Sequence, residues 1–320
     1  MTDFILEATG LKKYFTVKKD FFGRPRTSLR AVDGVDLKIK KGSTLGLVGE
    51  SGCGKSTTGR TILRLTKPDY GKVSFQGKDI FALSKSELRK IRPKMQLIFQ
   101  DPYSSLNGRM TVFELVSEAV AVHKIVPKSE LRDYTEEICQ KCGIAKSQLL
   151  RYPHEFSGGQ RQRICIARAL ALKPEFVVAD EPVSALDVSI QSQIINLLQD
   201  LKEEQKLSYL FISHDLSVVR HLCDDVAVMY MGKIVEKAPK SEIFANPLHP
   251  YTEALFSAIP TIDLSKKRKR IVLSGELPSA VNPPSGCPFH TRCHRCMDIC
   301  KKVIPEEKQI GLSTVRCHIY

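Results

Sequence analysis

GESGCGKST, at residues 49–57, fits the pattern G-x-x-x-x-G-K-[S/T] of a phosphate-binding loop. Glycines let such a loop curl so that its backbone N–H groups point at an anion. The lysine of the motif can reach the β- and γ-phosphates of a nucleotide, and the next hydroxyl can bind Mg²⁺. An apolar run at 43–48 precedes the loop and a helix-like stretch follows it, as the motif requires. The predicted ATP-binding residues of the loop are Gly49, Glu50, Ser51, Gly52, Cys53, Gly54, Lys55, Ser56 and Thr57.

A second chemical site follows the apolar run at residues 176–179, which reads as a buried parallel strand. Asp180 ends this run, where its carboxylate can hold Mg²⁺ through water. Glu181 follows and can polarise the water that attacks the nucleotide. A strand that ends in a polar turn is common by itself. Together with the upstream phosphate loop, the pair predicts a nucleotide-hydrolysing site.

The stretch FSGGQ at residues 156–160 is similar to the LSGGQ signature of the ABC ATPase family, with Phe156 in the first position. A serine and two glycines at the start of a helix provide backbone N–H groups for a second anion site. The chain resembles this family over residues 1 to about 240. The resemblance implies that two subunits bind two ATP molecules between them. Each signature would contact the ATP of the opposing subunit through Ser157, Gly158, Gly159 and Gln160.

The same resemblance implies roles for residues that occur in the family's order along the chain. Phe15 would stack on adenine, with Tyr14 as the alternative, and Asp187 would lie in the D-loop. Gln100 would contact Mg²⁺ and water, and His214 would contact the γ-phosphate. The implied catalytic residues are Glu181, His214 and Gln100, and the implied Mg²⁺ ligands are Ser56, Gln100 and Asp180.

Within that family, the chain resembles the ATPases of dipeptide and oligopeptide permeases, and most closely their "F" subunit. The shared features are QDPYSSLN at 100–107 with RMTV at 109–112, NPLHPYT at 246–252, and a group of cysteines near the end. Gly108 stands where the family usually has proline. The resemblance implies a distinct "D" ATPase, two membrane-spanning permease subunits and an extracytoplasmic solute-binding protein as partners.

The solute itself stays open, because an ATPase subunit does not touch it. Import of di- or oligopeptides is the leading hypothesis, and nickel or another solute is the alternative within the same family. An alternative from another class is a soluble ABC ATPase that acts on ribosomes or DNA. The basic net charge of +14 permits this reading, but the chain has one ATPase domain and no sustained heptads. We therefore expect no nucleic-acid partner.

The expected fold is α/β, a P-loop ABC-type ATPase domain with a parallel core sheet and an antiparallel β part. We expect this domain at residues 1–240, with a helical insertion at about 100–175. Residues 226–230 and 233–236 read as an edge hairpin. Residues 241–320 are rich in proline and are expected to form a small extension with little regular structure.

The chain has no apolar run of eighteen residues and no signal-peptide pattern at its N-terminus. We therefore expect a cytosolic protein that associates with the cytoplasmic face of a membrane through its partners. The basic run at 266–270 reads as an exposed linker, with attraction to anionic lipid as the alternative.

Five of the ten cysteines lie between residues 287 and 317. In a reducing compartment such a group indicates a metal centre and not disulfides. We expect a 4Fe–4S cluster, which takes four cysteines, with structural zinc as an alternative and no metal as a further one. The family pattern uses Cys287, Cys293, Cys300 and Cys317, and leaves Cys296 as an extra thiol.

Overall fold

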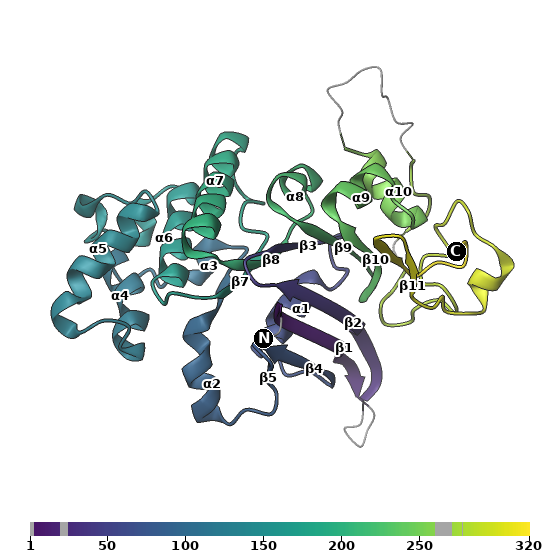
Figure 1. Cartoon of the computed structure of the whole chain (residues 1–320), viewed down its shortest axis with the longest axis horizontal. Coiled ribbons are helices and arrows are strands. Elements are labelled where there is room, and N and C mark those ends of the chain that lie inside the picture. The colour runs from purple at the N-terminus through teal and green to yellow at the C-terminus, as the bar shows by residue number, and fades with distance from the viewer. Residues whose placement is uncertain (1–2, 20–24, 260–270, 277) are drawn as a thin grey trace. The chain divides into compact units, whose positions relative to one another are not determined.

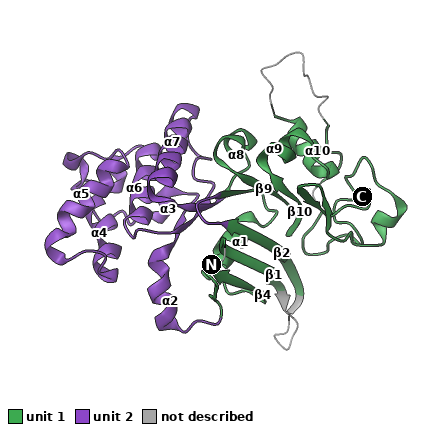
Figure 2. Cartoon of the chain, viewed as in Figure 1, with its two compact units in different colours: residues 1–39, 44–81, 212–320 green, residues 40–43, 82–211 purple. Residues whose placement is uncertain are grey.

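The computed structural model describes residues 3–19, 25–259, 271–276 and 278–320. The chain forms two compact units (Figure 2). Unit 1 comprises residues 1–39, 44–81 and 212–320, and unit 2 comprises residues 40–43 and 82–211. These units are not the predicted segments, whose boundaries near residues 100, 175 and 240 stay a prediction. The basic run at 266–270 lies outside the described residues.

Strands and helices alternate along much of the described chain (Figure 1). The strands are β1 (Phe4–Lys19), β2 (Pro25–Lys40), β3 (Thr44–Val48), β4 (Tyr70–Phe75), β5 (Lys78–Asp79), β6 (Met95–Ile98), β7 (Phe176–Asp180), β8 (Ser208–Ile212), β9 (Asp225–Tyr230), β10 (Lys233–Pro239), β11 (Lys308–Ile310) and β12 (Ser313–Val315). The helices are α1 (Lys55–Ile62), α2 (Lys85–Ile91), α3 (Pro102–Ser105), α4 (Val112–His123), α5 (Leu131–Lys141), α6 (Gly158–Leu170), α7 (Val188–Gln205), α8 (Leu216–Leu222), α9 (Lys240–Ala245) and α10 (Pro250–Ser257). Among the described helices, none combines the length and the hydropathy needed to cross a bilayer.

Unit 1 contains the strand that leads into the phosphate loop. Its larger set of strands follows the order β11-β12-β10-β9-β3, and β3 pairs parallel with β9 from Leu45↔Asp225 to Val48↔Val228. All five residues of β3 are buried, as expected for a parallel strand that is covered on both faces. A second sheet has the order β2-β1-β4-β5, with β1 and β4 antiparallel. The predicted antiparallel β part is therefore present.

The C-terminal extension adds strands to unit 1. The hairpin of β9 and β10 is antiparallel as predicted, but its predicted place at the edge is wrong. β12 pairs with β10 at Glu236↔Val315, and β11 follows β12. The extension also forms α10, so the expectation of little regular structure after residue 240 is only partly correct. Covering β10 satisfies backbone groups that an open sheet edge would expose.

Unit 2 has the strand order β8-β7-β6, and β6 pairs parallel with β7. All five residues of β7 are buried, in agreement with its apolar sequence. The chain between β6 and β7 is largely helical, and α4, α5 and α6 pack against one another (Figure 1). Thr111 caps α4 with a capping box, which explains why the helix begins at Val112.

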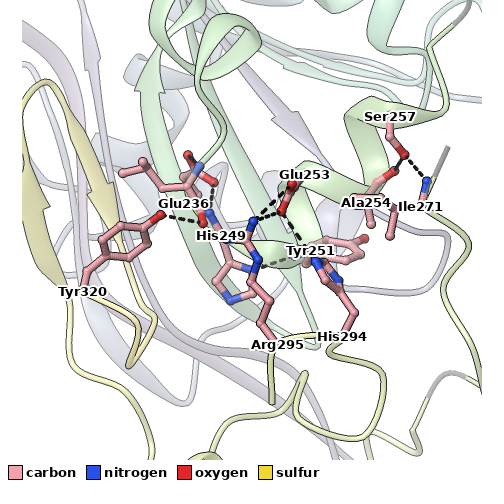
Figure 3. Close-up of polar contacts among 11 residues, drawn as sticks. Glu236, His249, Tyr251, Glu253, Ala254, Ser257, Ile271, His294, Arg295 and Tyr320 are labelled. Carbon is pink, nitrogen blue, oxygen red and sulfur yellow. Dashed lines mark hydrogen bonds and ion pairs between the residues drawn. The ribbon is translucent and has the colours of Figure 1, made fainter. Parts of the chain in front are cut away.

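A buried carboxylate joins β10 to the start of α10 (Figure 3). The two carboxylate oxygens of Glu236 accept the N–H groups of Leu248 and His249, each at 2.9 Å. Complete burial lowers the pKa of His249 to about 3, so its ring is neutral and its Nδ1 accepts the N–H of Tyr251 at 3.0 Å. Tyr320 donates its hydroxyl to the carbonyl oxygen of Leu248 at 3.2 Å. These bonds fix the segment that carries Tyr251.

The substitution Glu236→Gln is expected to lower the free energy of unfolding by about 1–3 kcal/mol. An amide has one acceptor oxygen, so one of the two buried N–H groups loses its partner. Urea unfolding of the purified protein measures the change, and Glu306→Gln, at an exposed position, is the matched control. Equal midpoints for Glu236→Gln, Glu306→Gln and the parent protein would contradict this role.

Candidate functional site

The loop between β3 and α1 has a backbone that only glycine fits. Gly49, Gly52 and Gly54 have φ values of 151°, 78° and 109°. A β-carbon on Gly49 would lie 2.2 Å from the carbonyl oxygen of Met229, and one on Gly54 would lie 2.0 Å from that of Ala31. The motif therefore needs glycine at these two positions because backbone oxygens of neighbouring strands occupy the space.

Lys55 is buried within this loop, with 4% of the residue exposed. Its Nζ donates to the carbonyl oxygens of Gly49 at 2.8 Å and Glu50 at 3.0 Å. An ammonium group has three donors, and the third has only a long contact of 4.0 Å with the Sγ of Cys53. Burial raises the pKa of the Cys53 thiol, so this sulfur is neutral. The third N–H of the Lys55 ammonium group can therefore donate a hydrogen bond to a phosphate bound at the loop.

The predicted catalytic carboxylate lies at the carboxyl end of β7 in unit 2. Asp180 is buried at the last position of the strand. Glu181 is only partly buried and has a φ of 45°, in the left-handed region that residues with a β-carbon seldom adopt. The Nε2 of Gln100 donates to its Oε2 at 2.9 Å. The structure therefore brings Gln100 and Glu181 together, and strained backbone of this kind is concentrated at functional sites.

The signature motif forms the beginning of α6. Ser157 is the N-cap: its Oγ accepts the N–H of Gln160 at 3.4 Å, and the Gln160 side chain accepts the N–H of Ser157 at 3.1 Å. Both side chains are exposed. Gly159 is buried, and a β-carbon there would lie 2.4 Å from Cγ2 of Ile190. An exposed helix N-terminus with close backbone packing fits the expected anion site.

The segment after Gln100 is attached to the same helix. The guanidinium of Arg161 lies 4.1 Å from the ring centre of Tyr103. Arg168 donates to the carbonyl oxygen of Ser105 at 2.6 Å. Leu106 is 7% exposed and packs locally, whereas Asn107 is exposed. A partner that binds this segment would therefore meet Asn107 and not Leu106.

The remaining predicted residues lie at exposed positions. Phe15 is 40% exposed, whereas the hydroxyl of Tyr14 donates to Asp33 at 2.5 Å and its N–H donates to Asp69 at 2.6 Å. Phe15 is therefore better placed than Tyr14 to stack on a ligand. His214 follows β8, and Asp187 is the N-cap of α7; the side chains of both are exposed.

Two residues of the C-terminal extension contact the phosphate loop, and the sequence analysis missed both. The guanidinium of Arg292 donates to both carboxylate oxygens of Glu50, at 2.8 and 3.1 Å. The hydroxyl of Tyr251 accepts the N–H of Glu50 at 2.9 Å. The sequence does mark Tyr251 as a residue of interest, since it lies in the HPYT element. Arg292 could not have been identified from the sequence, because nothing in its local sequence indicates a contact with residue 50.

The structure does not support the predicted 4Fe–4S cluster or the zinc alternative. Cys287, Cys300 and Cys317 are buried, Cys293 is partly buried and Cys296 is exposed, and all five are free thiols. In the part of the chain that the structure describes, no group of three or more His, Cys, Asp or Glu side chains is placed to hold a metal.

Comparison with known proteins assigns the family. The family model "ABC transporter" matches residues 32–184, and "Oligopeptide/dipeptide transporter, C-terminal region" matches residues 235–300. The chain is 55% identical to the "Oligopeptide transport ATP-binding protein AppF" of Bacillus subtilis, over 99% of this chain and 97% of that protein. The chain belongs to the ATP-binding proteins of oligopeptide and dipeptide ABC transporters. This ABC ATPase is also 48% identical to the "Dipeptide transport ATP-binding protein DppF" of Escherichia coli, over 98% of the chain and 93% of that protein.

Solved structures agree with this assignment. This ABC ATPase matches cbiO1 from Clostridium perfringens, part of the ABC transporter complex cbiONQ, with a TM-score of 0.65 and 28% identity. The match covers 77% of this chain and 92% of cbiO1. It also matches a dimeric ATP-binding cassette bound to ADP and Pi, with a TM-score of 0.66 and 28% identity over 73% of this chain and 98% of that one. The predicted α/β ABC-type fold is confirmed.

Two glycines of the loop allow a matched stability test. Gly52→Ala places a β-carbon in open space, so it should cost only the strain of positive φ, about 1–2 kcal/mol of the free energy of unfolding. Gly54→Ala adds an overlap with the carbonyl oxygen of Ala31 and should cost about 3 kcal/mol. Thermal unfolding of both variants measures the difference. Equal losses for the two would refute the described packing of Gly54.

Proposed function

We propose that this ABC ATPase binds and hydrolyses ATP to power the import of di- or oligopeptides through a membrane transporter. The observation that carries the proposal is full-length similarity to a protein named for oligopeptide transport, on a chain whose phosphate loop has the required geometry. The related proteins reported above are all named for transport, which disfavours the alternative of an ATPase that acts on ribosomes or DNA.

ATP is proposed to bind with its phosphates on the loop at residues 49–57. The backbone N–H groups of the loop and the N-terminus of α1 supply positive partial charge. Lys55 donates its third N–H to the β- and γ-phosphates while its other two remain on the loop carbonyls. Ser56 binds Mg²⁺ through its hydroxyl, and Phe15 stacks on the adenine ring. The positive charge of Lys55 and Mg²⁺ offsets the charge of the triphosphate.

For hydrolysis, we propose Glu181 as the group that orients and polarises the attacking water. Its hydrogen bond to Gln100 holds the carboxylate in place, and the backbone at Glu181 is in the left-handed region. Asp180 and Gln100 would hold Mg²⁺ together with Ser56, and the ion would offset negative charge on the phosphates. His214 contacts the γ-phosphate and stabilises the charge that develops in the transition state.

A second ATPase subunit is proposed to complete the site. The exposed Ser157 and Gln160 at the N-terminus of α6 would bind the γ-phosphate of the nucleotide on the opposing subunit. Asp187, in the D-loop, would lie at the same interface. We propose a distinct "D"-type subunit as this partner. The competent state is then a dimer with two nucleotides between the subunits.

The other proposed partners are two membrane-spanning permease subunits and an extracytoplasmic solute-binding protein. The chain would associate peripherally with the cytoplasmic face of the membrane. We propose residues 1–240 as the ATPase domain, with a helical insertion at about 100–175, and residues 241–320 as its extension. Mg²⁺ is the metal that this function requires. Nickel or another solute remains the alternative cargo, because the solute does not contact this subunit.

Glu181→Gln should abolish ATP hydrolysis while ATP binding is retained, because the amide cannot accept a proton from water. The assembled transporter, purified with its permease and partner ATPase, is assayed for phosphate release with solute-binding protein carrying either peptide or nickel. Wild-type activity should rise with the peptide-loaded protein. Glu118→Gln, an exposed position with the same charge change, should behave as wild type. Near-normal turnover by Glu181→Gln would sink the catalytic assignment.

The surface between Asp101 and Thr111 is proposed to bind a short cytoplasmic helix of a permease subunit. A photo-reactive amino acid at Asn107, which is exposed, should cross-link to a membrane-spanning subunit in the assembled transporter. The same group at Leu106, which is buried, should give a much lower yield. Mass spectrometry identifies the product. If Asn107 yields no permease adduct in an active complex, the docking surface lies elsewhere.

A further inference from the structure

Glu50 places a carboxylate within the loop that is proposed to bind the phosphates of ATP. Arg292 forms a two-pronged ion pair with it, with N–O distances of 2.8 and 3.1 Å. The Arg292 side chain is only 9% exposed and that of Glu50 is 27% exposed. Paired N–H donors on a carboxylate fix both distance and orientation, and a poorly hydrated pair is little screened by salt. This contact is thus more specific than a surface salt bridge.

The peptide groups of Glu50 are fixed as well. Its N–H donates to the hydroxyl of Tyr251 at 2.9 Å. Its carbonyl oxygen accepts the Nζ of Lys55 at 3.0 Å and the N–H of Cys53 at 3.3 Å. A single residue therefore joins the C-terminal extension to the lysine of the loop. A shift of Arg292 or Tyr251 would move the carbonyl that holds Lys55.

The two contacting residues of the extension share one aromatic cluster. The ring of Phe289 lies 5.3 Å from that of Tyr230 and 5.4 Å from that of Tyr251, and the two tyrosine rings are 4.7 Å apart. The N–H of Arg292 donates to the carbonyl oxygen of Phe289 at 3.0 Å. Tyr230, Tyr251 and Phe289 are at most 1% exposed. A packed cluster of this kind holds Arg292 and Tyr251 in fixed positions.

The negative charge of Glu50 would affect how the loop binds the phosphates of ATP. An unpaired carboxylate in an anion-binding loop would repel a triphosphate, and the repulsion is strong where water is excluded. Arg292 neutralises that charge, and Tyr251 fixes the peptide that carries it. We propose that Arg292 and Tyr251 are positioning residues that set the affinity of the phosphate loop for ATP, so that the C-terminal extension is part of the nucleotide site. The inference rests on the proposed ATP-binding function.

The proposal predicts that substitutions of the two ion-pair partners have different effects on ATP binding. Arg292→Gln leaves the Glu50 carboxylate unpaired and should weaken ATP binding. Glu50→Gln leaves a positive charge near the loop and should bind ATP at least as well as wild type. The double variant Glu50→Gln with Arg292→Gln removes both charges and should regain most of the lost affinity. If the pair served only to stabilise the fold, either single substitution would do comparable harm.

The experiment measures binding of a fluorescent ATP analogue with Mg²⁺ to the assembled transporter, at low and high salt. For Arg292→Gln we expect the Kd to rise about five- to tenfold at low salt, and less at high salt. The KM for ATP should rise in parallel while kcat changes little, since Arg292 does not touch the reacting atoms. Tyr251→Phe, which removes only the acceptor of the Glu50 N–H, should raise the Kd about twofold.

Arg295→Gln is the matched control, because Arg295 is a neighbouring arginine that forms an ion pair with Glu253, at 3.2 Å. Its Kd should equal that of wild type. Thermal unfolding of every variant separates loss of affinity from loss of fold. A Kd for Arg292→Gln within twofold of wild type, or a double variant as weak as Arg292→Gln, would overturn the inference. Failure of the wild-type complex to bind the analogue would instead overturn the proposed function.

Discussion

Two backbone oxygens, those of Met229 and Ala31, occupy the space where β-carbons at Gly49 and Gly54 would lie. This exclusion fixes the course of the phosphate loop between β3 and α1. It also requires that β9, which carries Met229, lie directly beside β3, as their parallel pairing provides. The loop geometry therefore depends on strands from both sheets of unit 1, β9 in one and β2 in the other. The motif supplies residues that tolerate the geometry, and the neighbouring strands impose it.

Charge within the loop is balanced by dipoles and by one distant side chain. Lys55 is buried on two carbonyl oxygens, which solvate its charge without neutralising it. A carboxylate partner would compete with a phosphate for the same cation, whereas carbonyl dipoles do not. The one carboxylate at the start of the loop, on Glu50, has its own cation in Arg292. Positive charge on the loop is thus left for an anionic ligand.

Local patterns predicted the elements that carry the motifs. β3 and β7 are largely apolar runs next to a glycine loop and a carboxylate pair, so their sequence predicts their type and, to within one residue, their ends. The contact of Arg292 with Glu50 spans 242 positions, and no local pattern can indicate it. β12 is three residues long, too short to show a strand period, and this is why the edge of the sheet was misplaced.

The predicted 4Fe–4S cluster lacks support for a different reason. The number of thiols near the C-terminus is a fact of the sequence, but metal binding depends on whether their sulfurs converge. In the described residues, no group of three or more potential ligands is placed to hold a metal, so the number of cysteines does not by itself establish a metal centre.

Strands of unit 1 that pair with one another are far apart in the sequence, so they leave the ribosome at different times. β3 pairs with β9 from Leu45↔Asp225, so the two partners are 180 residues apart (225 − 45). At common rates of translation, roughly 10–40 s separate their emergence from the ribosome. During this interval the nascent β3, whose five residues are all buried in the folded protein, has no β9 to pair with. Arg292 emerges later still, so a chain that is released early can contain the complete glycine motif and still lack the side chain that balances Glu50.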